Sequence, residues 1–130
     1  MYSEIYLVDD MEMVNVLHQV LIRQLGLEDR VKSFNDPEEA LDDLRFKMGK
    51  TEPILVLLDI NMPVMTGFEF LEFMVLESFP TNIDILVVTS SDSEEDKVLA
   101  EQYPQFVRGF VTKPLKIEDL RKHIVQAHSA

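Results

Sequence analysis

The sequence predicts an α/β fold: a three-layer, doubly wound domain in which helices cover both faces of a five-stranded parallel sheet. Two observations lead to this prediction. Aliphatic runs alternate five times with segments whose apolar residues recur at helical spacing. The runs are also nearly continuous in apolar residues, as is typical of parallel strands that are buried on both faces. A chain of 130 residues accommodates one such domain, so we assign residues 1–130 to it.

Strands are expected at the five aliphatic runs. These runs are Glu4–Val8, Arg30–Phe34, Ile54–Leu58, Ile83–Val88 and Phe106–Val111. Each run is followed by polar or turn-forming residues and then by a helical pattern. Because a helix separates each strand from the next, the strands are expected to pair in parallel.

The first two helices have clear ends. The first is expected over Met11–Leu25 and ends at Gly26, since glycine readily adopts the backbone conformation that ends helices. Its inward stripe is predicted from four apolar residues at helical spacing: Val14, Leu17, Leu21 and Leu25. The second starts within Asp36–Glu39, where Asp is the N-cap and Pro takes the first helical position, and it ends at Gly49. Its inward residues are predicted to be Ala40, Leu41, Leu44 and Met48.

The last three helices are less regular. One is expected over Phe68–Leu76, and its three phenylalanines cannot all face the same way, so one of them is expected to be exposed. The next helix starts in a segment that offers two overlapping capping pairs: Ser91 with Glu94, and Asp92 with Glu95. The final helix carries an inward stripe of Ile117, Leu120 and Ile124.

The composition excludes several classes of function. A formal net charge of −12, from 12 basic and 24 acidic residues, argues against direct binding to nucleic acid or to an anionic membrane. The chain has no cysteine, and therefore neither a disulfide nor a thiolate metal site. No apolar run approaches the roughly 20 residues of a membrane span, and the first residues lack the pattern of a signal peptide. We therefore expect a cytoplasmic protein.

Candidate site residues follow four of the five strands. In chain order, they are Asp9 and Asp10, then Asp59, then Thr89 and Ser90, and finally Lys113 and Pro114. Ligands bind at the carboxyl ends of strands in an open parallel sheet, so these side chains are expected to share one edge. Each residue alone has an ordinary explanation, such as a helix cap, a strand threonine or a solvated lysine. Their joint occurrence at four strand ends indicates a functional site.

The residue types at these strand ends suggest phosphoryl chemistry. Three clustered carboxylates repel one another, and a divalent cation would keep them ionised. Mg²⁺ prefers such hard oxygen ligands and keeps several waters. A phosphoryl group could then be held by the cation, the Lys113 ammonium and the Thr89 hydroxyl while a carboxylate oxygen attacks phosphorus.

On these residues, and on the run from Asp59 to Gly67, the chain resembles over its full length the CheY-like response-regulator receiver domains of bacterial two-component signalling. The resemblance implies a sheet with the strand order 2-1-3-4-5. It implies that Asp59 is the phosphoacceptor for a sensor histidine kinase or a histidine phosphotransfer protein. It also implies a Mg²⁺ site, which Mn²⁺ could fill as well, formed by Asp9, Asp10, Asp59 and the backbone carbonyl of Asn61.

The resemblance implies roles for the remaining residues too. Lys113 contacts the phosphate, Thr89 moves to hydrogen-bond it with Ser90 alongside, and Phe110 changes rotamer on activation. Structural roles are expected for Pro63, Gly67 and Pro114, with a cis peptide bond between Lys113 and Pro114. The surface formed by the fourth helix, the fifth strand and the last helix is expected to control a protein partner or a phosphorylation-dependent dimer.

Two other functions are compatible with parts of this pattern. A Mg²⁺-dependent phosphohydrolase of the haloacid-dehalogenase type needs a second Asp two residues after the nucleophile, where this chain has Asn61. A flavodoxin-like FMN site would place its phosphate against Asp9 and Asp10, which would repel it. We therefore expect a phosphoacceptor rather than an enzyme, acting as a stand-alone regulator, with a receiver cut from a longer protein as the alternative. The three histidines are interpreted as surface residues: His18, His123 and His128.

Overall fold

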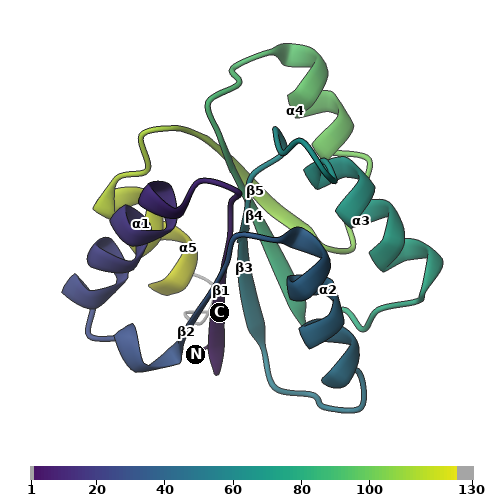
Figure 1. Ribbon diagram of the computed structural model, residues 1–130, viewed down its shortest axis with the longest axis horizontal. Coiled ribbons are helices and arrows are strands. Elements are labelled where there is room, and N and C mark those ends of the chain that lie inside the picture. Colours follow the sequence, from purple (N-terminus) through teal and green to yellow (C-terminus); the bar gives the residue numbers. More distant parts are fainter. Residues whose placement is uncertain (1, 126–130) are drawn as a thin grey trace.

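Five strands form one parallel sheet in the computed structural model, which describes residues 2–125 (Figure 1). The strands are β1 (Glu4–Val8), β2 (Val31–Phe34), β3 (Ile54–Leu58), β4 (Ile83–Thr89) and β5 (Val107–Thr112). Their order is β2-β1-β3-β4-β5, as predicted. Val8 pairs with both Phe34 and Leu58, so the carboxyl ends of β1, β2 and β3 lie level at one edge of the sheet.

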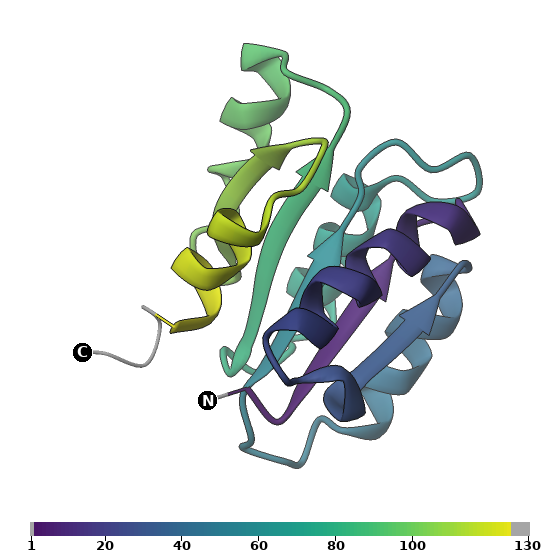
Figure 2. The ribbon, with the colours of Figure 1, turned by 90° about the vertical axis from the view of Figure 1, so that its left-hand side faces the viewer.

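Helices cover both faces of the sheet and make a three-layer domain, as predicted. One face is covered by α1 (Glu12–Gln24) and α5 (Ile117–Val125), which lie in front of the sheet in Figure 2. The other face is covered by α2 (Pro37–Phe46), α3 (Gly67–Leu76) and α4 (Glu94–Ala100). A single turn of 3-10 helix, η1 (Glu28–Arg30), precedes β2. Within residues 2–125, no helix combines the length and apolar character needed to cross a membrane.

Two apolar cores lie on opposite sides of the sheet. Alternate residues of a strand point to opposite faces, so Tyr6 and Val8 of β1 join the core beneath α2, α3 and α4, whereas Ile5 and Leu7 join the core beneath α1 and α5. All five residues of β3 are buried, because this strand is central and covered on both faces. Asp59, the residue that follows β3, therefore extends from a strand that is buried along its whole length.

Side chains cap the N-termini of α2, α3 and α4, and the cap of α4 differs from the prediction. Asp36 caps α2 as predicted, accepting a hydrogen bond of 2.9 Å from the N–H of Glu38. The predicted caps of α4, Ser91 and Asp92, are wrong, since Ser93 accepts from the N–H of Asp96 at 3.1 Å. The Ser91 hydroxyl instead donates to the Asp96 carboxylate. Several neighbouring residues could act as cap, and only the path of the loop from β4 selects among them.

The inward face of α1 also differs from the prediction. Its buried residues are Asn15, His18 and Ile22, whereas Leu17 is 57% exposed. The predicted apolar stripe is thus rotated partly into solvent. The physical reason lies in the polar groups that the first half of α1 covers. Asn15 donates to backbone carbonyls at the ends of β1 and β2, and His18 lies near Asp9 and Lys113. Such neighbours are better matched by an amide and an imidazole than by aliphatic side chains.

Element ends shift by a few residues elsewhere. The α2 helix ends at Phe46 rather than at Gly49, with Lys47 as its C-cap, although Met48 still packs against the core as predicted. The β5 strand begins and ends one residue later than predicted. On α3, Phe70 is fully buried and Phe73 is 39% exposed, which confirms that its phenylalanines do not share one face.

Candidate functional site

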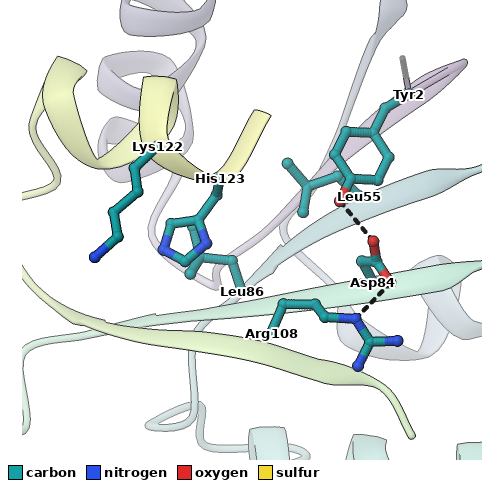
Figure 3. A pocket seen from close by; sticks show the side chains of 7 residues that line it. All are labelled: Tyr2, Leu55, Asp84, Leu86, Arg108, Lys122 and His123. Carbon is teal, nitrogen blue, oxygen red and sulfur yellow. Dashed lines mark hydrogen bonds and ion pairs between the residues drawn. The ribbon is translucent and has the colours of Figure 1, made fainter. Parts of the chain in front are cut away.

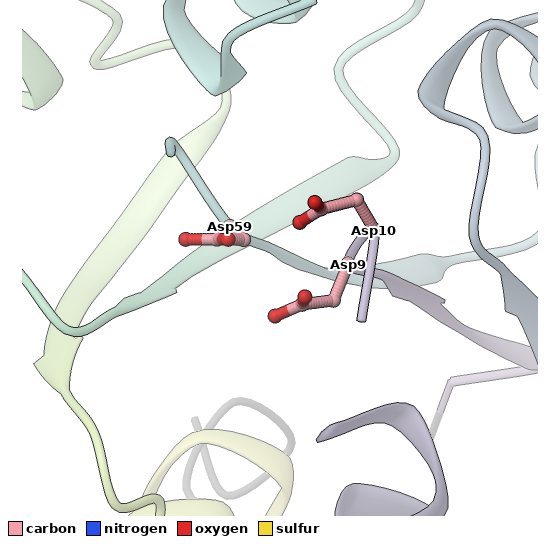
Figure 4. A group of neighbouring side chains, drawn as sticks. All are labelled: Asp9, Asp10 and Asp59. Carbon is pink, nitrogen blue, oxygen red and sulfur yellow. The ribbon is translucent and has the colours of Figure 1, made fainter. Parts of the chain in front are cut away.

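Three carboxylates meet at the carboxyl edge of the sheet (Figure 4). Asp9 and Asp10 directly follow β1, and Asp59 directly follows the neighbouring β3. One oxygen atom from each lies within 4.8 Å of the others. Asp9 and Asp59 are buried, whereas Asp10 is exposed. The predicted convergence of these acids is therefore confirmed.

Asp59 lies in an electrostatically strained position. Burial raises the pKa of its carboxyl above the ordinary value, and the neighbouring Asp9 charge raises it further. Opposing these effects, the Lys113 ammonium, whose Nζ lies 3.8 Å from Asp59 Oδ2, stabilises the ionised form. The same Nζ lies 2.6 Å from Asp9 Oδ2. One cation among three carboxylates leaves the cluster short of positive charge.

The loop after Asp59 folds back closely over the acidic residue. The N–H of Asn61 donates to Asp59 Oδ1 at 3.2 Å, and the N–H of Gly67 donates to the Ile60 carbonyl at 3.1 Å. A Cβ at position 67 would come 2.6 Å from the backbone oxygen of Asp59, which is too close for any side chain. Pro63 is exposed at the outer part of the loop. Gly67 is thus needed for the close approach of α3 to Asp59.

Thr89, the last residue of β4, is fully buried beside Asp59. Its Oγ1 accepts hydrogen bonds from Asn61 Nδ2 and from the N–H of Ser91, each at 3.2 Å. Its hydroxyl also contributes to lowering the pKa of Asp59. The adjacent Ser90 is exposed at the mouth of the site.

The loop after β5 brings Lys113 to the cluster. The N–H of Lys113 donates to the Thr89 carbonyl at 2.7 Å, which aligns this loop with the end of β4. The peptide bond between Lys113 and Pro114 is cis, as predicted. Phe110, three residues earlier, is half-buried against the core under α4 and lines a groove of about 330 Å³ between α4 and β5. Phe110 therefore contacts the core while part of its ring borders the surface.

Two residues of α1 were not predicted to belong to this region. His18 was interpreted as a surface residue, but it is only 7% exposed. Burial and, to a smaller extent, the Lys113 ammonium lower its pKa to about 4, while the Asp9 charge acts in the opposite direction. Asn15, one turn earlier, is 1% exposed. The sequence signal was the helical spacing of Asn15, His18 and Ile22, which places polar residues on a face otherwise taken as outward.

The opposite, amino-terminal edge of the sheet contains a separate cavity of about 410 Å³ (Figure 3). Asp84 of β4 accepts a hydrogen bond from the Tyr2 hydroxyl at 2.6 Å and pairs with Arg108 Nε at 3.1 Å. His123 of α5 points toward this cavity and packs over Gly109, where a Cβ would come 2.4 Å from its ring. His123 is therefore half-buried rather than a simple surface residue. The third histidine, His128, lies outside the described residues.

The residues at the carboxyl edge are chemically suited to a hard divalent cation. The candidate ligand atoms are carboxylate oxygens, with no thiolate or imidazole in the cluster. Both oxygens of Asp9 already accept hydrogen bonds, one from the N–H of Met11 at 2.9 Å and the other from Lys113 Nζ at 2.6 Å. Asp10 forms no hydrogen bond or ion pair within the described residues, so its carboxylate is available as a ligand.

Comparison with known proteins places the chain in a family. A profile of the response regulator receiver domain matches residues 5–125, and the chain therefore belongs to this family. Receiver domains generally bind Mg²⁺ and interact with histidine kinases or phosphotransfer proteins.

Relatives and solved structures agree with this assignment. The probable methanogenesis regulatory protein FilR2 of Methanothrix harundinacea is 33% identical over 126 residues, covering 92% of this chain and 77% of the relative. A two-component response regulator from Cytophaga hutchinsonii is 25% identical, with a TM-score of 0.82 over 98% of this chain and 97% of the other. The chemotaxis protein CheY4 of Vibrio cholerae is 27% identical, with a TM-score of 0.74 over 97% and 98% of the two chains.

Proposed function

We propose that the chain is a phosphoacceptor whose Asp59 receives a phosphoryl group from a sensor histidine kinase or a histidine phosphotransfer protein. The observation that carries this proposal is the position of Asp59: buried at the end of the central strand, among two further carboxylates and beside the Lys113 ammonium. Asp9 is also buried in this cluster, but its two carboxylate oxygens already accept hydrogen bonds from the N–H of Met11 and from Lys113.

Transfer to Asp59 is a displacement at phosphorus. A carboxylate oxygen of Asp59 attacks, the N–P bond of the donor phosphohistidine breaks, and its electron pair returns to the donor imidazole, which takes up a proton. The Lys113 ammonium lies close enough to stabilise the charge on the transferred phosphoryl oxygens. The hydroxyl of Thr89 can supply a further donor after a small displacement.

The proposal includes Mg²⁺, or Mn²⁺ in its place, at the carboxylate cluster. Asp10 and Asp59 would bind it directly with the backbone carbonyl of Asn61, and Asp9 would act mainly through water, since both Asp9 oxygens already have partners. When bound, the cation would neutralise carboxylate repulsion and the charge of the incoming phosphoryl group. Lys113 alone does not balance the three acids.

We propose no catalysis on a separate substrate. The chain would take part only in its own phosphorylation and dephosphorylation. Asn61 occupies the position at which an aspartyl-phosphate phosphohydrolase requires an acid, and its amide group donates to Thr89 instead of activating water. The alternative hydrolase function therefore lacks its general acid.

The output surface proposed for the phosphorylated protein comprises α4, β5 and α5. If Thr89 moves toward a phosphoryl group on Asp59, its hydrogen bonds to Asn61 and Ser91 must rearrange, and space opens near the half-buried Phe110. A rotation of Phe110 would reshape the groove between α4 and β5, which adjoins the surface where a protein partner or a second copy would bind. Amide spectra recorded with and without beryllofluoride test this step. Shifts confined to the loop after Asp59, with none on α4 and β5, would contradict it.

Mass spectrometry after incubation with Mg²⁺ and acetyl phosphate tests the phosphoacceptor itself. The protein should gain the mass of one phosphoryl group, and Asp59→Asn should abolish the gain. Asp29→Asn, which alters an exposed acid of η1, is the matched control and should be phosphorylated normally. Undiminished phosphorylation of Asp59→Asn would refute the assignment.

A further inference from the structure

Two asparagine side chains converge on the backbone carbonyl of Asp9. Asn15 Nδ2 donates to this carbonyl at 3.0 Å and also to the Phe34 carbonyl at 3.0 Å. Asn35 Nδ2 donates to the same Asp9 carbonyl at 3.2 Å. The N–H of Asp9 donates to the Phe34 carbonyl at 3.2 Å. The peptide groups at the ends of β1 and β2 are thus fixed by side chains where the regular strand pairing stops.

The fixed carbonyl belongs to the peptide group that joins Asp9 to Asp10. The Asp10 side chain is exposed and makes no hydrogen bond or ion pair within residues 2–125. Its carboxylate nevertheless lies within 4.8 Å of oxygen atoms on Asp9 and Asp59, which repel it. With no side-chain partner to hold it, the position of Asp10 depends on its backbone, and therefore on the hydrogen bonds to the Asp9 carbonyl.

The hydrogen bonds of the Asn15 side chain are donated by its Nδ2, whereas its Oδ1 accepts none within the described residues. The residue is 1% exposed, and its Oδ1 is a buried acceptor that has no hydrogen-bond partner within the described residues. A buried polar atom without a partner is unfavourable, so an apolar side chain would avoid this penalty on the inner face of α1. The presence of an amide at this buried position is explained by its hydrogen bonds to two backbone carbonyls, one of which belongs to the residue before Asp10.

We propose that Asn15 is a positioning residue for the cation site, acting through the Asp9 carbonyl to hold Asp10 beside Asp59 against their mutual repulsion. This inference rests on the proposed function, because it takes the carboxylate cluster to bind Mg²⁺. A ligand held in place before binding loses less conformational freedom when the cation arrives. Asn35 shares the Asp9 carbonyl but not the Phe34 carbonyl, and it is exposed, so its contribution is smaller.

Titration of ¹⁵N-labelled protein with MgCl₂, followed by amide chemical shifts, tests the role of Asn15. Asn15→Ala should weaken Mg²⁺ binding by about 10- to 100-fold, as is typical when a residue that orients a metal ligand is removed. Asn35→Ala should weaken it less. Asn82→Ala is the matched control: Asn82 Nδ2 also joins two backbone carbonyls, those of Lys50 and Glu52, but at the opposite edge of the sheet. This control should lose stability in urea unfolding while its Mg²⁺ affinity stays unchanged.

The outcomes separate the two proposals. Unchanged Mg²⁺ affinity in Asn15→Ala, with reduced stability, would show a purely structural role and overturn the inference. If Asn15→Ala does not fold, Asn35→Ala provides the test. A measurable loss of its Mg²⁺ affinity supports the inference, and an unchanged Mg²⁺ affinity overturns it. Failure of the wild-type protein to bind Mg²⁺, or unchanged binding in Asp10→Ala, would instead overturn the proposed metal site.

Discussion

His18 should make the folding stability depend on pH. In the folded protein, burial and the Lys113 ammonium lower its pKa to about 4, whereas an unfolded chain has a histidine pKa near 6.5. Between these values the unfolded state binds more protons, so protonation favours unfolding. The contribution of uncharged His18 to the free energy of unfolding is fully present above pH 6.5. It is lost progressively as the pH falls from 6.5 toward 4. At pH 5 the two pKa values correspond to a loss of about 2 kcal/mol of stability relative to pH 8.

Urea unfolding at pH 8 and pH 5, with a chelator present, measures this loss. The drop in free energy of unfolding between the two pH values should be about 2 kcal/mol larger in the wild-type protein than in His18→Gln, which cannot titrate there. Asp59, whose raised pKa acts with the opposite sign, is common to both proteins and cancels. His123→Gln is the control, and it should change the pH dependence less because His123 is only half-buried.

The difference between wild-type protein and His18→Gln tests whether His18 is neutral and buried in the folded state. If wild-type protein and His18→Gln lose stability equally between pH 8 and pH 5, then His18 is either protonated or solvated in the folded state. The same result would mean that the inner face of α1 tolerates a charged imidazole beside Lys113.

Two further predictions concern the metal and the loop. Asp10→Ala should weaken Mg²⁺ binding, measured by amide shifts, more than Asn61→Ala does, since the latter keeps its backbone carbonyl; equal losses would contradict the proposed ligands. Gly67→Ala should destabilise the fold by about 1–3 kcal/mol in urea unfolding, because its Cβ would come 2.6 Å from the Asp59 backbone oxygen. Gly49→Ala is the control, with no atom within 4 Å of a Cβ, and a change as large as that of Gly67→Ala would argue against the steric explanation.

Much of the fold could be predicted from local pattern alone. Buried parallel strands are nearly continuous in apolar residues, so the runs at Glu4–Val8 and Ile54–Leu58 had almost no alternative interpretation. The convergence of Asp9, Asp10 and Asp59 followed from this, because each directly follows a strand and the strands are neighbours. The end of a strand can be located from the local sequence, so residues at strand ends can be identified without knowledge of distant contacts.

What could not be predicted depends on contacts between distant segments. The inner face of α1 was misjudged because apolar spacing favoured Leu17, whereas His18 is buried near Asp9 and Lys113, and Lys113 lies far away in the sequence. The cap of α4 was misassigned because Ser91 and Ser93 both have an acid three residues later, and only the loop path distinguishes them. Tertiary packing determines which face of a helix is buried and which residue caps it. The periodicity of a single sequence carries no information about that packing.

The contacts of Asp84 give the sheet a mechanical asymmetry. At the amino edge, Tyr2, β4 and β5 are joined through Asp84 and Arg108, so neighbouring strands are fastened together there. At the carboxyl edge, the Thr89 side chain forms no ion pair within the described residues; it accepts hydrogen bonds from the exposed Asn61 side chain and from the N–H of Ser91. A displacement that begins at Thr89 would therefore be largest near the loops at the carboxyl edge. It would decrease along the strands toward Asp84. Amide hydrogens around Asp84 are expected to exchange slowly both with and without beryllofluoride.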